Sequence, residues 1–152
     1  MARYLLDANV LIALCWSQHT HHTAALAWFK NHSKHGWATC ALTQAAFVRV
    51  ILQPAFSGEP MQAHEVIELL ARTTSHPQHH YLPIDFDMLQ VQAACTGGLL
   101  GHRQITDAWL LTTAIRHKAK LVTFDAGISS LLAKPSERLA HVHCLKETSD
   151  LH

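Results

Sequence analysis

Three aspartates that are far apart in the chain occupy positions where carboxylates could act together. Asp7 ends one short apolar run, Asp125 ends another, and Asp107 lies near the start of a helix-like segment that leads into the second run. A lone carboxylate is costly to bury, so each of these acids needs a partner. Capping a helix is the ordinary role of an aspartate at such a turn. The alternative is a shared site that requires negative charge, and the spacing leaves both interpretations open.

The elements that must position these acids follow from the alternation of apolar runs with helix-like segments. Strands are predicted at 2–7, 36–41, 79–84, 120–125 and 139–145. Helices are predicted at 9–16, 22–32, 42–52, 59–73, 85–95, 105–119 and 126–133. Strands that alternate with helices form a parallel sheet covered on both faces, so the fold class is α/β.

The carboxyl ends of the strands are the expected place for a site, because ligands of open parallel sheets bind there. Three carboxylates held close at that edge repel one another, and a cation would neutralise them. Oxygen ligands without clustered thiols favour Mg²⁺ or Mn²⁺ over zinc. Such an ion polarises a phosphoryl oxygen and lowers the pKa of a water, which is the chemistry of phosphodiester hydrolysis.

Composition bounds the class of protein. The 152 residues fit one domain, and 49% hydrophobic with 15% charged residues is the balance of an ordered globular chain. A net charge of +1 does not by itself indicate nucleic-acid binding, but a local basic patch would be enough to bind a nucleic acid. We predict no membrane segment and no secretory signal, which places the protein in the cytoplasm with its four scattered cysteines reduced.

The wording of three segments resembles the PIN-domain family, and more narrowly the VapC ribonuclease toxins. The segments are YLLDANVLIAL from residue 4, LTQAAFVRV from residue 42 and HRQITDAWLLTTAIRHKAKLVTFDAGI from residue 102. The resemblance implies a three-layer α/β/α sandwich with a central parallel sheet. It implies a single PIN-like nuclease domain over residues 1–145, followed by a C-terminal tail at 146–152.

The same resemblance implies an activity and its partners. The family's members are Mg²⁺-dependent endoribonucleases, with Mn²⁺ as a substitute, and each is the toxin of a toxin–antitoxin pair. The expected partners are therefore an RNA substrate, a cognate antitoxin and a second copy of the chain in a homodimer.

The family's acids fall on residues of this sequence. Asp7, Asp107 and Asp125 are the implied catalytic residues, with Asp7 and Asp107 as metal ligands and Asp125 acting through water. Asn9 and Thr123 match small polar positions that flank the first and last acids, where they would orient carboxylates or waters.

Basic residues and one further polar residue complete the predicted site. Arg103 lies shortly before Asp107 and is the first basic residue we expect to contact a phosphate. Gln44, on the helix predicted at 42–52, lies two residues before the position of the family's missing glutamate and about 200° away around the helix. Its side chain would reach the site only if that helix is oriented differently from what the alignment with the family implies.

One departure from the family pattern concerns its second acid. The family commonly carries a glutamate on the helix after the second strand, and Ala46 occupies that position here. The alternative function is therefore a catalytically weakened PIN-fold module that binds RNA or an antitoxin. Asp85 follows the third predicted strand and could replace the acid, but we favour it as the cap of helix 85–95.

Overall fold

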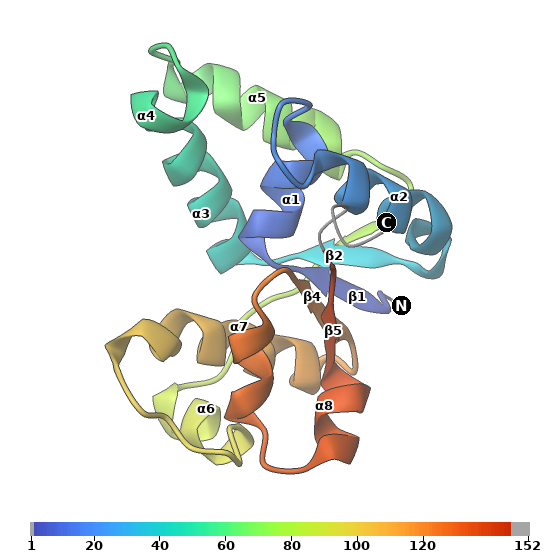
Figure 1. The fold of residues 1–152 in the computed structure, drawn as a ribbon, viewed down its shortest axis with the longest axis vertical. Coiled ribbons are helices and arrows are strands. Elements are labelled where there is room, and N and C mark those ends of the chain that lie inside the picture. The colour runs from blue at the N-terminus through green and yellow to red at the C-terminus, as the bar shows by residue number, and fades with distance from the viewer. Residues whose placement is uncertain (1, 147–152) are drawn as a thin grey trace.

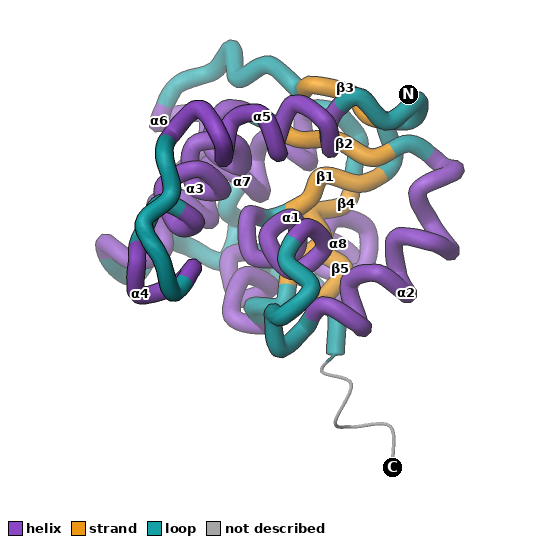
Figure 2. Tube along the Cα trace, turned by 90° about the horizontal axis from the view of Figure 1, so that it is seen from above, coloured by secondary structure: helices purple, strands orange, loops and turns teal. Residues whose placement is uncertain are grey.

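The computed structural model describes residues 2–146, and a five-stranded sheet is at its centre. The strands are β1 (Tyr4–Leu6), β2 (Trp37–Thr39), β3 (His79–Tyr81), β4 (Lys120–Thr123) and β5 (Val142–Cys144). Every neighbouring pair is parallel, in the order β3-β2-β1-β4-β5, which Figure 2 shows from above. The parallel sheet of an α/β fold is confirmed.

Helices form a layer on each face of this sheet (Figure 1). One layer contains α1 (Ala8–Cys15), α2 (His22–His32), α3 (Ala41–Ile51), α4 (Pro54–Ser57) and α5 (Ala63–Thr74). The other contains α6 (Met88–Ala94), α7 (Ile105–Arg116) and α8 (Pro135–His141). Three short 3-10 turns complete the fold: η1 (Ser33–His35), η2 (His102–Gln104) and η3 (Ala126–Leu131). The three-layer sandwich is thus present.

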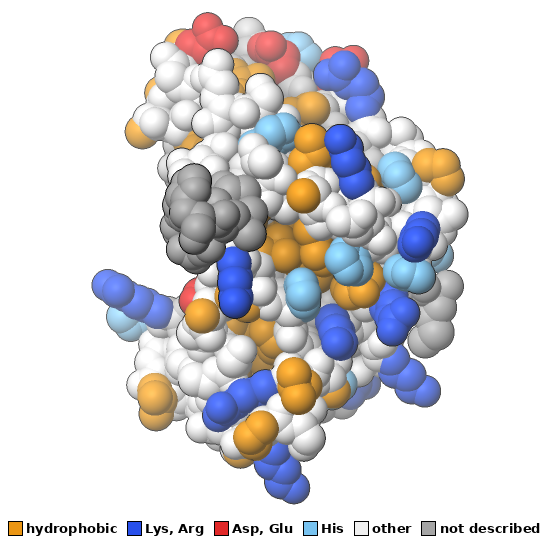
Figure 3. Space-filling model, turned by 45° about the vertical axis from the view of Figure 1, so that its right-hand side comes forward, with side chains coloured by type: hydrophobic (Ala, Val, Ile, Leu, Met, Phe, Trp, Pro, Cys, Tyr) orange, Lys and Arg blue, Asp and Glu red, His pale blue; other side chains and the backbone are white. Residues whose placement is uncertain are grey.

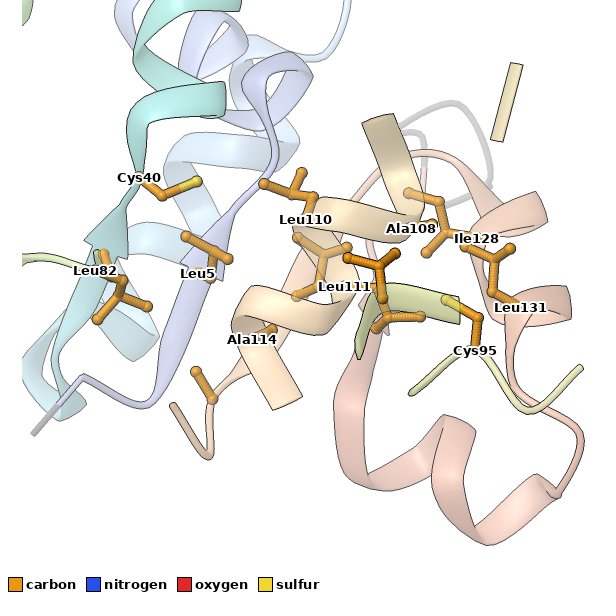
Figure 4. Close-up of a cluster of buried hydrophobic side chains, with 14 of the residues drawn as sticks. Leu5, Cys40, Leu82, Cys95, Ala108, Leu110, Leu111, Ala114, Ile128 and Leu131 are labelled. Carbon is orange, nitrogen blue, oxygen red and sulfur yellow. The ribbon is translucent and has the colours of Figure 1, made fainter. Parts of the chain in front are cut away.

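Alternation along β1 divides the core into two halves. Tyr4 and Leu6 pack with residues of α1, α2, α3 and α5, whereas Leu5 packs on the opposite face with α6 and α7. Figure 4 shows Leu5 facing Leu110 and Leu111 of α7 in that second half. Because both faces are covered, β1, β2 and most of β4 are buried, whereas the edge strands β3 and β5 are partly exposed.

The chain reverses its direction of travel through the sheet between β1 and β4. From β1 it moves outward through β2 to β3 with its helices in one layer, and it returns to β4 through α6 and α7 in the other. Leu6 pairs with Val122, so the carboxyl ends of β1 and β4 lie side by side. This is the switch point where doubly wound sheets bind ligands.

Two predicted elements near the C-terminal half of the chain were wrong in part. The strand predicted at 139–145 begins only at Val142, because Pro135 starts α8 and the helix runs on to His141. The helix predicted at 85–95 begins at Met88. Its cap is Asp87 rather than Asp85: the carboxylate accepts from Gln90 N, and the Gln90 side chain accepts from Asp87 N.

Other expectations concern thiols, membranes and the tail. All four cysteines are free thiols, and Cys40 and Cys95 are buried. Within residues 2–146, the helices are all too short or too polar to cross a bilayer. The tail predicted at 146–152 lies outside the described residues, apart from Lys146.

Candidate active site

Asp7 stands at the end of β1 and also begins α1. Its Oδ1 accepts a hydrogen bond from Ala8 N at 2.7 Å, and its Oδ2 accepts one from the hydroxyl of Thr123 at 2.7 Å. Burial raises the pKa of Asp7, the bonds from Thr123 and Ala8 lower it, and the nearby charge of Asp125 raises it again, with a net rise above 3.8. The residue is therefore both a helix cap and a destabilised anion.

Thr123 connects two of the three predicted acids. Its side chain is fully buried at the end of β4, and its hydroxyl donates to Asp7 while accepting from Asp125 N at 3.0 Å. Asp125 is exposed, and its Oδ1 accepts from Gly127 N at 2.9 Å at the start of η3. One hydroxyl thus fixes the positions of both segments at the switch point.

Asp107 joins the same cluster from the first turn of α7. Its side chain is half-buried, and its pKa is raised from 3.8 to about 6. Burial is the main cause, and the charges of Asp7 and Asp125 add to it. Because both of those charges act on Asp107, the three acids occupy one site although they come from three separate segments. The three acids therefore lie close together, as their positions in the sequence predicted.

Asn9 lies two residues after Asp7, on the first turn of α1. Its Oδ1 atom is buried and accepts no hydrogen bond. A buried amide oxygen without a donor is costly, so a further ligand at this place would stabilise the protein. Its position beside the acid cluster makes it a candidate to receive a water or a cation.

The donor set tests whether a divalent ion fits this site. The only charges that act on Asp107 in the described chain are two like charges, so a cation would relieve both its repulsion and that on Asp7. In residues 2–146 no group of three His, Cys, Asp or Glu side chains is arranged to hold one ion together. The cluster therefore suits an ion that is bound by two carboxylates and retains several water ligands. Mg²⁺ is usually bound in this way.

Helix α3 is anchored beside the site by a residue that sequence analysis passed over. Thr43 is buried, and its hydroxyl donates to Leu6 O at 3.0 Å, one residue before Asp7. Ala46 is three residues further on and so shares this side of the helix. Gln44 instead donates from Nε2 to the Thr39 hydroxyl at 3.0 Å, which places its side chain against the end of β2.

Two further residues adjoin the acids along the chain. Arg103 is exposed in η2, directly before the helix that carries Asp107. Phe124, between Thr123 and Asp125, stacks on His21 with ring centroids 4.5 Å apart. The segment between α1 and α2 therefore reaches the site, and no spacing in the sequence indicated this.

The chain is similar to known proteins over most of its length. The model of the PIN domain family matches residues 4–131. Ribonuclease VapC44 of Mycobacterium tuberculosis is 39% identical over 143 residues, covering 94% of this chain and 99% of the relative. Ribonuclease VapC38 of the same species is 39% identical over 127 residues, covering 84% and 88%.

One solved structure extends the comparison to the fold. VapBC2 from Rickettsia felis, crystallised with a DNA fragment from its promoter, contains a chain that superposes with a TM-score of 0.64. The match covers 94% of this chain and 98% of the other at 12% sequence identity. At that identity the likeness concerns the fold alone.

Proposed function

Because this chain belongs to the PIN-domain family and, within it, to the VapC ribonucleases, we propose that it is a Mg²⁺-dependent endoribonuclease and the toxin of a toxin–antitoxin pair. The reaction is hydrolysis of RNA phosphodiester bonds. The observation that carries the proposal is the cluster at the switch point, where Asp7 and Asp125 share Thr123, and where burial together with the charges of Asp7 and Asp125 raises the pKa of Asp107.

The residues of the cluster would have different roles in the reaction. Asp7 and Asp107 would hold the ion, which when bound supplies charge to a phosphoryl oxygen and acidifies a water. Thr123 and Ala8 N hold the Asp7 carboxylate in one orientation. Asp125 is exposed at the rim, where its carboxylate accepts the proton of the attacking water.

The surroundings of the cluster would position the RNA. Arg103 meets a phosphate next to the scissile bond, since an exposed guanidinium binds phosphate oxygens in pairs. The buried Oδ1 of Asn9, which has no hydrogen-bond partner, would accept a hydrogen bond from a water at the site. Mn²⁺, which prefers the same oxygen ligands, would substitute for Mg²⁺.

The proposed partners are a cognate antitoxin and a second copy of the chain. The structural relative from Rickettsia felis is VapBC2 bound to a fragment of its promoter, and this supports an antitoxin for the present chain. A toxin that cuts cellular RNA acts in the cytoplasm. We propose that the chain acts there as a homodimer once its antitoxin is lost.

Cleavage of total cellular RNA by the purified protein tests the proposal. We expect cleavage with Mg²⁺ or Mn²⁺, none with EDTA, and a fall of at least about 100-fold in the Asp107→Asn variant, since loss of a ligand exceeds the effect of an outer-shell change. Asp87→Asn is the matched control, because asparagine also caps α6. Equal cleavage by Asp107→Asn and Asp87→Asn overturns the proposal.

Ala46 favours a second candidate function, a PIN-fold module that binds RNA or an antitoxin without cutting. One acid fewer than the family commonly has lowers the affinity for an ion. Growth arrest after expression in a bacterial host separates the two functions. The nuclease predicts that Asp107→Asn abolishes arrest, whereas the binding module predicts that the variant arrests growth as the unchanged protein does.

A further inference from the structure

Two adjoining cavities lie beside the start of β1 and the end of α7, and neither is lined by a residue of the acid cluster. Their volumes are about 350 Å³ and about 270 Å³, and both are lined by Ala2 and Lys118. The six basic side chains of their lining, three of them permanently charged, are Arg3, His35, His80, Arg116, His117 and Lys118. We name these two cavities together the cationic depression. No acidic residue is among the described residues that line it.

The cationic depression is separate from the site of the three acids. Arg3 precedes β1 and Asp7 follows it, so the two are about 13 Å apart at roughly 3.3 Å per residue. The face that Figure 3 brings forward includes the side where the chain begins, and Lys, Arg and His side chains are spread across it. Its Asp and Glu side chains lie mainly at the top of the view.

Helix capping explains only part of this charge. Arg116 and the two residues after it follow the last turn of α7, where positive charge is favourable because of the helix dipole. Arg3 precedes β1 and His80 lies within β3, so neither is at a helix end, yet both line the cationic depression. With His35 of η1, four segments therefore supply basic side chains to one place.

Lys118 adds an independent observation. Its φ is 57°, and among the described residues it is the only one other than glycine with a positive φ. The turn is closed by bonds from Lys118 N to Ile115 O and from Ala119 N to Ala114 O. Glycine is the ordinary residue at such a helix end, since a side chain is strained there. Strain of this kind is retained most often at functional sites.

We propose that the cationic depression binds the phosphate backbone of RNA away from the scissile bond. Backbone contacts position a nucleic acid without reading its sequence, which suits exposed Arg3, Arg116 and Lys118. The choice of RNA rests on the proposed function. An RNA that contacts both the cationic depression and the acids spans the surface between them, so the contacts in the depression would determine which phosphate reaches the acids.

The salt dependence of binding tests this inference. Binding of a labelled single-stranded RNA is measured by fluorescence anisotropy between 50 and 200 mM KCl, with EDTA present to prevent cleavage. In the Arg3→Ser/Lys118→Gly double variant, the slope of log K against log[KCl] should become shallower by about 1.4, from about 0.7 for each cation lost. Glycine at position 118 relieves strain, so unfolding does not explain a loss.

A control variant removes the same charge elsewhere. Arg72 and Lys134 are exposed and line neither cavity, so Arg72→Ser/Lys134→Ser should leave the slope unchanged. Equal slopes in the two double variants overturn the inference. A loss confined to duplex DNA of the same length overturns the assignment to RNA. A shallower slope in a protein that cuts no RNA supports the inference and contradicts the proposed nuclease instead.

Discussion

Replacing Asp107 by asparagine should stabilise the metal-free protein while it destroys activity. In the folded chain its pKa is about 6, against an ordinary value of 3.8. At 1.36 kcal/mol per pH unit this difference corresponds to roughly 3 kcal/mol. The side chain is half-exposed, and solvent screening reduces the figure to about 1–2 kcal/mol. Asparagine has the same shape without the charge that burial and two neighbouring carboxylates oppose.

The sign of the pH dependence follows from proton binding. Between pH 3.8 and about 6 the folded state holds more protons at Asp107 than the unfolded chain does, so the stability of the unchanged protein falls as pH rises. The Asp107→Asn variant lacks this contribution. The two proteins should therefore have similar stability near pH 4 and reach their full difference above about pH 6.

Thermal unfolding in EDTA, from pH 4 to pH 8, measures this difference. A gain of 1–2 kcal/mol corresponds to a rise in Tm of about 2–8 °C in a chain of this size. Mg²⁺ at ten times its Kd should stabilise the unchanged protein by about 1.4 kcal/mol and leave the variant as it was. A variant that is less stable than the unchanged protein at pH 7.5, or a difference that does not vary with pH, refutes the electrostatic reasoning.

Three other substitutions have expected outcomes. Thr123→Val removes the hydroxyl shared by two acids, so RNA cleavage should fall at least about 10-fold and the pKa of Asp7 should rise further, as measured by NMR titration. Ala46→Glu should tighten Mn²⁺ binding by at least about 10-fold in calorimetry, because Ala46 lies on the side of α3 that Thr43 anchors next to Asp7. Lys118→Gly should raise stability to urea by about 1 kcal/mol, because it removes a side chain from a left-handed conformation.

The fold could be predicted because its strands are short, apolar and separated by helices. Parallel pairing then required the acids that follow β1 and β4 to lie at one edge. One error occurred where two residues could fill the same role. Asp87 and not Asp85 caps α6, and the signal was present in the sequence, since only Asp87 has a glutamine three residues later.

The site was less accessible to sequence reasoning than the fold. Asp107 was assigned through family resemblance, because an acid in a first helical turn has an ordinary explanation in the helix dipole. The role of Thr43 depends on a hydrogen bond to a residue 37 positions away in the chain. The strain at Lys118 depends on a positive φ, which a lysine in the sequence does not indicate. Long-range contacts and unfavoured φ values are set by packing, which spacing along a chain does not contain.

Asp7 both caps α1 and, in the proposed function, binds the metal ion. A carboxylate has two oxygens with two lone pairs each. Ala8 N occupies one lone pair of Oδ1 and Thr123 one of Oδ2, which leaves one on each oxygen for a cation. The two bonds lower the pKa of Asp7 against its burial, so they keep an anion at the end of a buried strand. Because the bonds that begin α1 are the ones that hold the charge, the site cannot lose this acid without weakening the helix that follows it.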